Sequence, residues 1–322
     1  MTPIYKILAD NNDITSAIKD RLISLTITDE AGMQSDSLTL VLDDRDNSIE
    51  LPRKGVQLDV YIGYKETGLV KKGLFTVDEI EISDTPDTLT IKGKAANMRN
   101  SLKAPKTRSF DQKKLGDIIK TIAQDNQLTP KISPELSELV IPHLDQTNES
   151  DLHFLTRIAK MYGAVSKPVE GNLLFAIKGE TKSVTGKVLS AVNIDRNQTS
   201  DYRASLADRD KYKSVIAYWQ DTSTAQKIAV KTSNETPSFT LRHTYPDPEA
   251  ATQTAKSKMA SLNRGTGTIS ITLSNGNALL FAESLLNLSG FRDGINGAWT
   301  STRVEHEISG GGYKTRVDAE VK

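Results

Sequence analysis

Apolar and polar residues alternate in several stretches near the start of the chain, and this pattern constrains the fold more than any other feature. The alternation runs through residues 23–28, 38–42 and 56–62. A period of two buries one face of each strand and leaves the other face in water. The alternation changes phase at Asp78-Glu79, which predicts a β-bulge or a sharp bend. We therefore expect a first β-barrel module over residues 1–94.

The apolar period changes from two to helical spacing after this module. Apolar residues between 115 and 122 have the spacing of one helix face, and Asp111 is a plausible N-cap for that helix. A clearer helix is predicted over residues 146–163. Asn148 can cap its start, and Gly163 suits the position just after its end.

Two further regions complete the expected organisation. Short extended segments flank Glu170-Gly171-Asn172, which reads as a hairpin turn and predicts a small α/β domain over residues 95–185. Alternating strands then return, with one helix expected at about 247–262, so we expect a second β-barrel module over residues 186–322. The predicted fold class is mainly β with an α+β insertion, in which two related β-barrel modules flank a small α/β domain.

Three pairs of segments repeat in the same order at the two ends of the chain. The matching segments are 36–44 and 268–276, 63–65 and 290–292, and 73–81 and 297–305. The glycines and aromatic residues at the corners of this repeat are Gly63, Gly73, Phe75, Gly290, Gly297 and Trp299. The order favours an internal duplication of one strand meander. Chance similarity is the alternative, because glycine before a strand and an aromatic residue within it are common.

The overall composition excludes several classes of function. Lysine plus arginine and aspartate plus glutamate both number 41, so no net charge draws the chain to nucleic acid or to a membrane surface. Cysteine is absent, which excludes disulfides, thiolate nucleophiles and cysteine-ligated metals. The first residues, MTPIYKILADNND, lack the pattern of a signal peptide, and no window has the apolar length of a membrane span. We therefore expect a soluble cytosolic protein without a membrane anchor.

One local charge bias stands out between Lys94 and Lys120. Eight basic and two acidic residues lie in this segment. Only Phe110 is aromatic, so stacking on single-stranded nucleic acid is not expected. The bias fits either a solvated face or contact with an acidic partner, and we expect no specific nucleic-acid binding.

Residues with catalytic chemistry do not form a recognisable constellation. The four histidines lack the spacing of a helical zinc pair, and Asp43–Asn47 lacks the glycine and glutamate of a calcium loop. Glu149 and Asp151 fit the first turn of a helix, where the macrodipole favours acidic residues. His306 alternates with apolar neighbours and is expected on a strand face. We therefore predict no catalytic residues, no metal site and no cofactor.

Several of these stretches together resemble a known family. The run QTNESDLHFLTRIAKMYGA at residues 146–164 is similar to a motif of the phage late control protein D family, the central hub proteins of contractile-tail baseplates. The matching positions are Gln146, Glu149, Ser150, Asp151, Phe154, Leu155 and Arg157. Segments 73–81, 102–110 and 299–317 support the resemblance, which spans nearly the whole chain. The N-terminal part of type VI secretion spike proteins is similar more distantly.

The resemblance implies a structural protein rather than an enzyme. It implies a homotrimeric, pseudo-sixfold ring that adapts a sixfold tail tube protein to a threefold central spike protein, with other baseplate or tape-measure proteins as further partners. The expected location is the baseplate of a virion tail or an equivalent injection particle, assembled in the bacterial host cytoplasm. Two other functions stay open at this point: a tail-associated cell-wall hydrolase and a glycan- or receptor-binding module.

Overall fold

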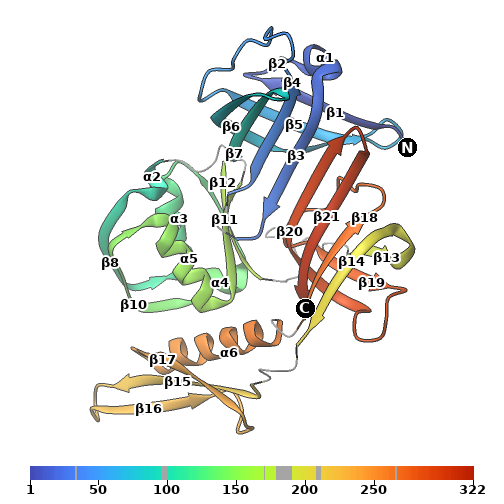
Figure 1. The fold of residues 1–322 in the computed structure, drawn as a ribbon. Coiled ribbons are helices and arrows are strands. Elements are labelled where there is room, and N and C mark those ends of the chain that lie inside the picture. Colours follow the sequence, from blue (N-terminus) through green and yellow to red (C-terminus); the bar gives the residue numbers. More distant parts are fainter. Residues whose placement is uncertain (33–34, 96–99, 170, 179–190, 208–211, 265–266) are drawn as a thin grey trace. The chain divides into compact units, whose positions relative to one another are not determined.

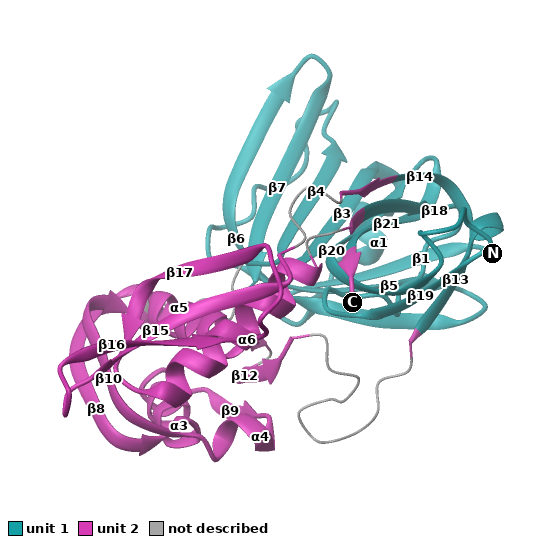
Figure 2. Ribbon diagram, turned by 90° about the horizontal axis from the view of Figure 1, so that it is seen from below, with its two compact units in different colours: residues 1–98, 192–203, 269–319 teal, residues 99–191, 204–268, 320–322 magenta. Residues whose placement is uncertain are grey.

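The computed structural model describes residues 1–322 except 33–34, 96–99, 170, 179–190, 208–211 and 265–266. The chain forms two compact units that are each assembled from separate stretches of sequence (Figure 2). Unit 1 comprises residues 1–98, 192–203 and 269–319. Unit 2 comprises residues 99–191, 204–268 and 320–322. The fold is mainly β, as the alternating pattern predicts.

One sheet of thirteen strands among the described residues contains both ends of the chain (Figure 1). Its N-terminal strands are β1 (Pro3–Ala9), β2 (Asn12–Asp13), β3 (Leu22–Glu30), β4 (Ser37–Asp43), β5 (Gln57–Tyr64), β6 (Gly68–Asp84) and β7 (Asp87–Ala95). Its later strands are β13 (Val192–Asp195), β14 (Thr199–Leu206), β18 (Gly267–Leu273), β19 (Leu285–Ser289), β20 (Gly297–Ser309) and β21 (Gly312–Val321). The short helix α1 (Thr15–Ile18) and the 3-10 turn η1 (Lys19–Arg21) precede β3, and a second 3-10 turn, η2 (Arg196–Gln198), precedes β14.

Two sets of six strands within this sheet have the same order. The first set, which we call the N-set, runs β3-β4-β7-β6-β5-β1, and the second, the C-set, runs β14-β18-β21-β20-β19-β13. Along the chain, each position of the N-set has a counterpart at the same position of the C-set. One pairing differs, because β1 is antiparallel to β5 whereas β13 is parallel to β19. The sets join where β20 pairs with β3 (Figure 1).

The core of the N-set follows directly from the alternation. Every second residue of β4 and β5 is buried, including Leu40 and Val60. The predicted change of phase is confirmed as a bulge in β6, where the register with β7 shifts between Val77 and Glu79. A second shift in β6, at Lys72, was not predicted.

Unit 2 combines a small α/β layer with a three-stranded sheet. The first part holds α2 (Asn100–Lys103), β8 (Pro105–Lys114), α3 (Leu115–Asp125), β9 (Thr129–Ile132), α4 (Pro134–Ser137), β10 (Val140–Ser150), α5 (Asp151–Tyr162), β11 (Ala164–Val169) and β12 (Asn172–Ile177). The second part holds β15 (Ser214–Asp221), β16 (Gln226–Lys231), β17 (Ser238–Tyr245) and α6 (Pro248–Arg264). Apolar residues of β15, such as Val215, pack against Ala251 and Ala255 of α6.

The predicted helices exist, but two of their starts are wrong. Helix α5 begins at Asp151 rather than at residue 146, because the preceding residues pair with β8, and Ser150 rather than Asn148 caps it. Helix α3 follows Lys114, whereas Asp111 lies in strand β8 and caps nothing. The end of α5 is as predicted, since Gly163 has the left-handed conformation with φ of 63°.

The grouping of residues also differs from sequence order. The expected helix at 247–262 is present as α6, but it belongs to unit 2 together with β15, β16 and β17. The predicted hairpin is formed by antiparallel β11 and β12, although Glu170 lies outside the described residues. The boundaries 1–94, 95–185 and 186–322 stay a prediction about how the chain divides into modules. Of the helices that the structure describes, none has the length and hydropathy needed to cross a membrane.

Candidate functional site

The junction between the N-set and the C-set is the first candidate site. Strand β20 pairs antiparallel with β3 from Arg303 opposite Glu30 to Ser309 opposite Ser24. The Arg303 Nε lies 3.2 Å from Glu30 Oε1 and forms an ion pair at one end. Ile308 of β20 belongs to the same buried apolar cluster as the N-set core. One continuous core therefore extends across the junction.

A buried histidine lies at the centre of this junction. The Tyr313 Oη and the Thr315 Oγ1 lie 2.9 and 3.0 Å from Nδ1 of His306, and Nε2 of His306 lies 3.1 Å from the Leu280 carbonyl. This set of partners fits the neutral ring with its proton on Nε2. Burial, followed by the nearby charge of Lys72, lowers the pKa of His306 to about 3. The predicted strand-face position of His306 is confirmed, and the face is the buried one.

Lys72 connects the two sets from the unpredicted bulge in β6. Its Nζ donates hydrogen bonds to the carbonyls of Ala278 and Leu280, at 3.1 and 2.8 Å. Burial lowers the pKa of Lys72 to about 8. The bulge aims the side chain of an N-set strand at the backbone that leads into the C-set strand β19. Sequence reasoning missed both this bulge and Lys72.

The repeated glycine and aromatic positions occupy matching places in the two sets. Val60 of β5 pairs with Gly73, and Leu58 pairs with Phe75. In the C-set, Leu288 of β19 pairs with Gly297, and Leu286 pairs with Trp299. Both glycines have positive φ, and both aromatic side chains are fully buried. The Trp299 Nε1 also donates a 2.8 Å hydrogen bond to the Ile295 carbonyl.

The corner glycines Gly63 and Gly290 serve related but unequal turns. A Cβ at Gly63 would lie 2.0 Å from the carbonyl oxygen of Gly68, so only glycine fits this close approach. Gly290 follows the end of β19 with φ of 73°, which is the left-handed region. Gly63 lies three residues beyond Val60, whereas Gly290 lies two residues beyond Leu288. The two corners therefore differ by one residue.

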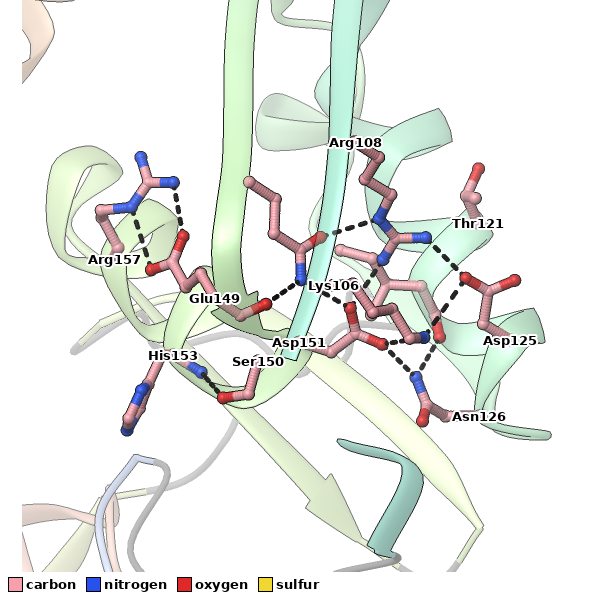
Figure 3. Close-up of polar contacts among 12 residues, drawn as sticks. Lys106, Arg108, Thr121, Asp125, Asn126, Glu149, Ser150, Asp151, His153 and Arg157 are labelled. Carbon is pink, nitrogen blue, oxygen red and sulfur yellow. Dashed lines mark hydrogen bonds and ion pairs between the residues drawn. The ribbon is translucent and has the colours of Figure 1, made fainter. Parts of the chain in front are cut away.

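The family motif in unit 2 surrounds a buried carboxylate, which is the second candidate site (Figure 3). Asp151 is fully buried at the start of α5, and Lys106 and Arg108 of β8 each approach one of its oxygens at 2.7 Å. Asn126 and Gln146 donate further hydrogen bonds to the same carboxylate, at 2.8 and 2.9 Å. Burial opposes ionisation of Asp151, but these donors outweigh it and lower its pKa.

The register between β8 and β10 brings these donors together. Arg108 lies opposite Gln146, and its Nε donates a 2.7 Å hydrogen bond to the Gln146 amide oxygen. The Gln146 amide nitrogen in turn donates to the carbonyl of Glu149. A second guanidinium nitrogen of Arg108 contacts Asp125 at 2.6 Å. Gln146 and Asp151 therefore belong to one ion-pair network, which we call the Asp151 network.

The other motif residues build the start of α5 and its apolar face. The Ser150 hydroxyl accepts a hydrogen bond from the backbone nitrogen of His153 at 3.2 Å. Glu149 and Arg157 form an ion pair at 2.7 Å. Phe154 and Leu155 are fully buried.

The basic excess before residue 120 is partly neutralised within unit 2. Lys106 and Arg108 are held by the Asp151 network. Lys114 pairs with Glu138 at 2.6 Å, and Lys120 pairs with Asp117 at 3.2 Å. Arg99 lies outside the described residues. The local excess of positive charge is therefore smaller in the structure than a count of the sequence suggests.

The remaining candidates for metal or proton chemistry have other uses. In the segment Asp43–Asn47, which forms a turn, Asp46 accepts two short hydrogen bonds from Arg21. Within the described residues, no three histidine, cysteine or acidic side chains gather as metal ligands. His143 lies between Asp111 and Asp145, at 2.5 and 3.0 Å. The bonds to Asp111 and then to Asp145 raise the pKa of this exposed histidine.

Comparison with known proteins gives matches in both sequence and fold. The family model described as phage tail baseplate hub (GPD) matches residues 71–312. The probable baseplate hub protein of Escherichia phage P2 is 33% identical over 100% of this chain and 94% of that protein.

Two solved structures share the fold at low identity. The tail protein from Neisseria meningitidis MC58 has a TM-score of 0.73 and 13% identity, over 99% of this chain and 97% of the other. The c3393 protein of E. coli, a component of the type VI secretion system, has a TM-score of 0.55 and 10% identity, over 94% of this chain and 74% of the other. The family match and the full-length relative together show that the chain belongs to the phage tail baseplate hub family and is a baseplate hub protein of phage tails.

Proposed function

We propose that three copies of this chain form a closed, pseudo-sixfold ring that adapts a sixfold tail tube to a threefold central spike. The observation that carries the proposal is the shared order of strands in the N-set and the C-set. Two related modules in each chain give six in a trimer. Such a ring can present sixfold contacts on one side and threefold contacts on the other.

The matched details of the two sets support a duplicated module. In β6 and in the equivalent strand β20, a glycine of positive φ lies two residues before a fully buried aromatic residue. These pairs are Gly73 with Phe75 and Gly297 with Trp299. In each set, the strand at the start of the strand order, β3 or β14, directly follows a 3-10 turn. Agreement of strand order, turns and core positions is more than chance similarity between short segments would produce.

A structural role rather than a catalytic one accounts for the polar residues of the candidate sites. The Asp151 carboxylate is enclosed by four donors, and the Glu149 carboxylate is paired with Arg157. Glycoside hydrolysis needs two acids that face each other across a cleft, whereas these two acids are both held by the basic or amide groups beside them. We propose that the protein acts without catalysis or cofactor. Its partners are then the tail tube, the central spike and neighbouring baseplate proteins, with assembly in the host cytoplasm.

The mass of the purified chain in solution tests this proposal. Light scattering of the chain alone should give about 106 kDa, three times the chain mass of 35.3 kDa. If a candidate spike protein is needed for assembly, the mass of the complex should equal that of three chains plus the bound spike. A mass of 35.3 kDa under both conditions would contradict the ring. A peptidoglycan zymogram provides the matching test of catalysis, since clearing by the purified protein would favour a cell-wall hydrolase instead.

A further inference from the structure

Strand β20 has two different neighbours along one of its edges. Its first residues pair with β19, where Gly297 lies opposite Leu288. Its last residues, from Arg303 to Ser309, pair with β3 of the N-set. In this way the C-set strand β20 supplies an edge to which the first strand of the other set is joined.

The equivalent strand of the N-set has the same division but lacks the second neighbour. The first half of β6 pairs with β5 through Thr76. Val77 bonds to the backbone around Val56. From Glu79 to Asp84, β6 pairs with β7 on one side, and no strand among the described residues pairs with its other side. We call this free stretch the β6 edge.

The equivalent of β3 in the C-set also has a free edge. Strand β3 pairs with β4 on one side and with β20 on the other. Strand β14, which holds the same place in its set, lies at the end of the strand order and pairs with β18 alone among the described strands. The β20–β3 contact that joins the two sets therefore has no counterpart between the equivalent strands β6 and β14 of the same chain. Each of these two strands has a free edge among the described residues instead.

Exposed apolar side chains mark both edges. Ile82 pairs with Leu89, so it lies on the face that is buried elsewhere in the set, yet it is 59% exposed. At the equivalent position of β20, which pairs with β3 on this edge, His306 is 1% exposed. Leu206 at the end of β14 is 53% exposed. Side chains on the core-facing side of a sheet become exposed in this way when a neighbouring strand is absent.

We propose that the β6 edge pairs antiparallel with β14 of a second copy of the chain, in the register of the β20–β3 junction. The proposal rests on the homotrimer described under the proposed function and names the strands that would form it. The register of the β20–β3 junction is transferred to β6 and β14 by two alignments. Gly73 is aligned with Gly297, and Leu22 is aligned with Thr199, since each of the latter two directly follows a 3-10 turn. Ile82 then lies opposite Ala204 of the second copy.

The side chains on the two edges are complementary in this register. The partner of Ile80 is Leu206 of the second copy, so an apolar pair forms on the core-facing side. On the other side, Arg203 of the second copy lies opposite Ser83 and diagonal to Glu81, within reach of an ion pair. Each chain offers one copy of each edge, so the contact is head-to-tail and closes into a ring when the rotation per module allows it.

Cysteine cross-linking tests the register, because the chain has no cysteine of its own. The full-length variant Ile82→Cys with Ala204→Cys should form an intermolecular disulfide on mild oxidation, since directly opposed residues of paired strands have the separation that a disulfide needs. Non-reducing electrophoresis should then show covalent dimers and trimers and no longer species.

Three control variants define the result. Ile82→Cys with Ser200→Cys keeps the same face but shifts the register by four residues, and each single-cysteine variant tests for random collision. All three should give little cross-linked product. Equal or stronger cross-linking in the shifted pair would overturn the proposed register.

The light-scattering mass of the same samples before oxidation separates the two proposals. A trimer that does not cross-link through Ile82 and Ala204 would overturn this interface and leave the ring intact. A chain that is monomeric with and without spike protein, and that does not cross-link, would overturn both. A trimer that cross-links in this register, and that dissociates in an Ile82→Asp variant but not in a Leu51→Asp control, supports the interface; Leu51 is 50% exposed but lies outside the paired strands.

Discussion

The sheet of unit 1 and the motif layer of unit 2 are stabilised in different ways. In unit 1, alternating apolar residues are buried along the strands, with Phe75 and Trp299 at equivalent places of its two strand sets. In unit 2, an apolar helix face packs beside a buried carboxylate that four donors enclose.

This difference has consequences for how each unit can vary. An apolar core tolerates exchange of side chains of similar size, so Phe75 and Trp299 can differ while the strand order is kept. A buried charge tolerates little, because removal of one partner leaves the others without compensation. Substitutions of the motif residues around Asp151 should therefore affect one another, whereas substitutions of the repeat residues should have separate effects on stability.

The largest expected effect is on the apolar core. Trp299→Ala should lower the free energy of unfolding by about 3–5 kcal/mol, because it removes a fully buried side chain and its hydrogen bond to Ile295. Chemical denaturation monitored by circular dichroism would measure the change. Phe75→Ala is the matched variant at the equivalent position of the N-set, and it should cost a similar amount. If Trp299→Ala unfolds at the same denaturant concentration as the wild type, the assignment of a core role to this position is wrong.

A smaller effect is expected in the Asp151 network. Asp151→Ala should cost about 1.5–3 kcal/mol, since it removes charge-assisted hydrogen bonds from a buried site and leaves Lys106 and Arg108 facing each other. This loss exceeds what the helix dipole alone would give. Asp117→Ala is the matched control, because Asp117 is the exposed acid in the first turn of α3. Equal losses in the two variants would mean that the network adds nothing beyond the dipole.

The smallest effect concerns the junction histidine and the pH. Unfolded chains bind a proton at His306 near its ordinary pKa of 6.5, whereas burial keeps the folded pKa at about 3. Stability should therefore be unaffected by this group above pH 6.5 and should fall as the pH drops toward 3. The expected loss between pH 7 and pH 5 is about 2 kcal/mol.

Unfolding free energies of the wild type and of His306→Gln at the two pH values would measure this contribution. The glutamine variant should be less stable at pH 7 but should lose less on acidification. Because the pKa of exposed His143 is raised, that group acts in the opposite direction, and it is present in both proteins. The same decline in both proteins would show that His306 does not cause it.

The sequence predicts the parts of this structure that depend on local pattern. Alternation gives the strands β3, β4 and β5, and its change of phase gives the bulge before Glu79. The apolar stripe and Gly163 give helix α5 and its end. These features depend on residues that are near neighbours along the chain.

Features that depend on distant partners could not be predicted in the same way. The start of α5 is displaced because residues before Asp151 pair with β8, far earlier in the chain. The contacts of Lys72 with Ala278 and Leu280 need the fold of the whole sheet before they exist. The same holds for the free β6 edge, because whether an edge is free depends on how all the other strands of the sheet pair.

Electron microscopy of the purified chain, with spike protein if the chain alone is monomeric, tests the ring arrangement by imaging it. We expect closed rings of three chains, in which six similar β-barrel modules alternate between N-set and C-set around the axis. Open filaments, two-fold dimers, or rings in which the two sets occupy unrelated positions would contradict it.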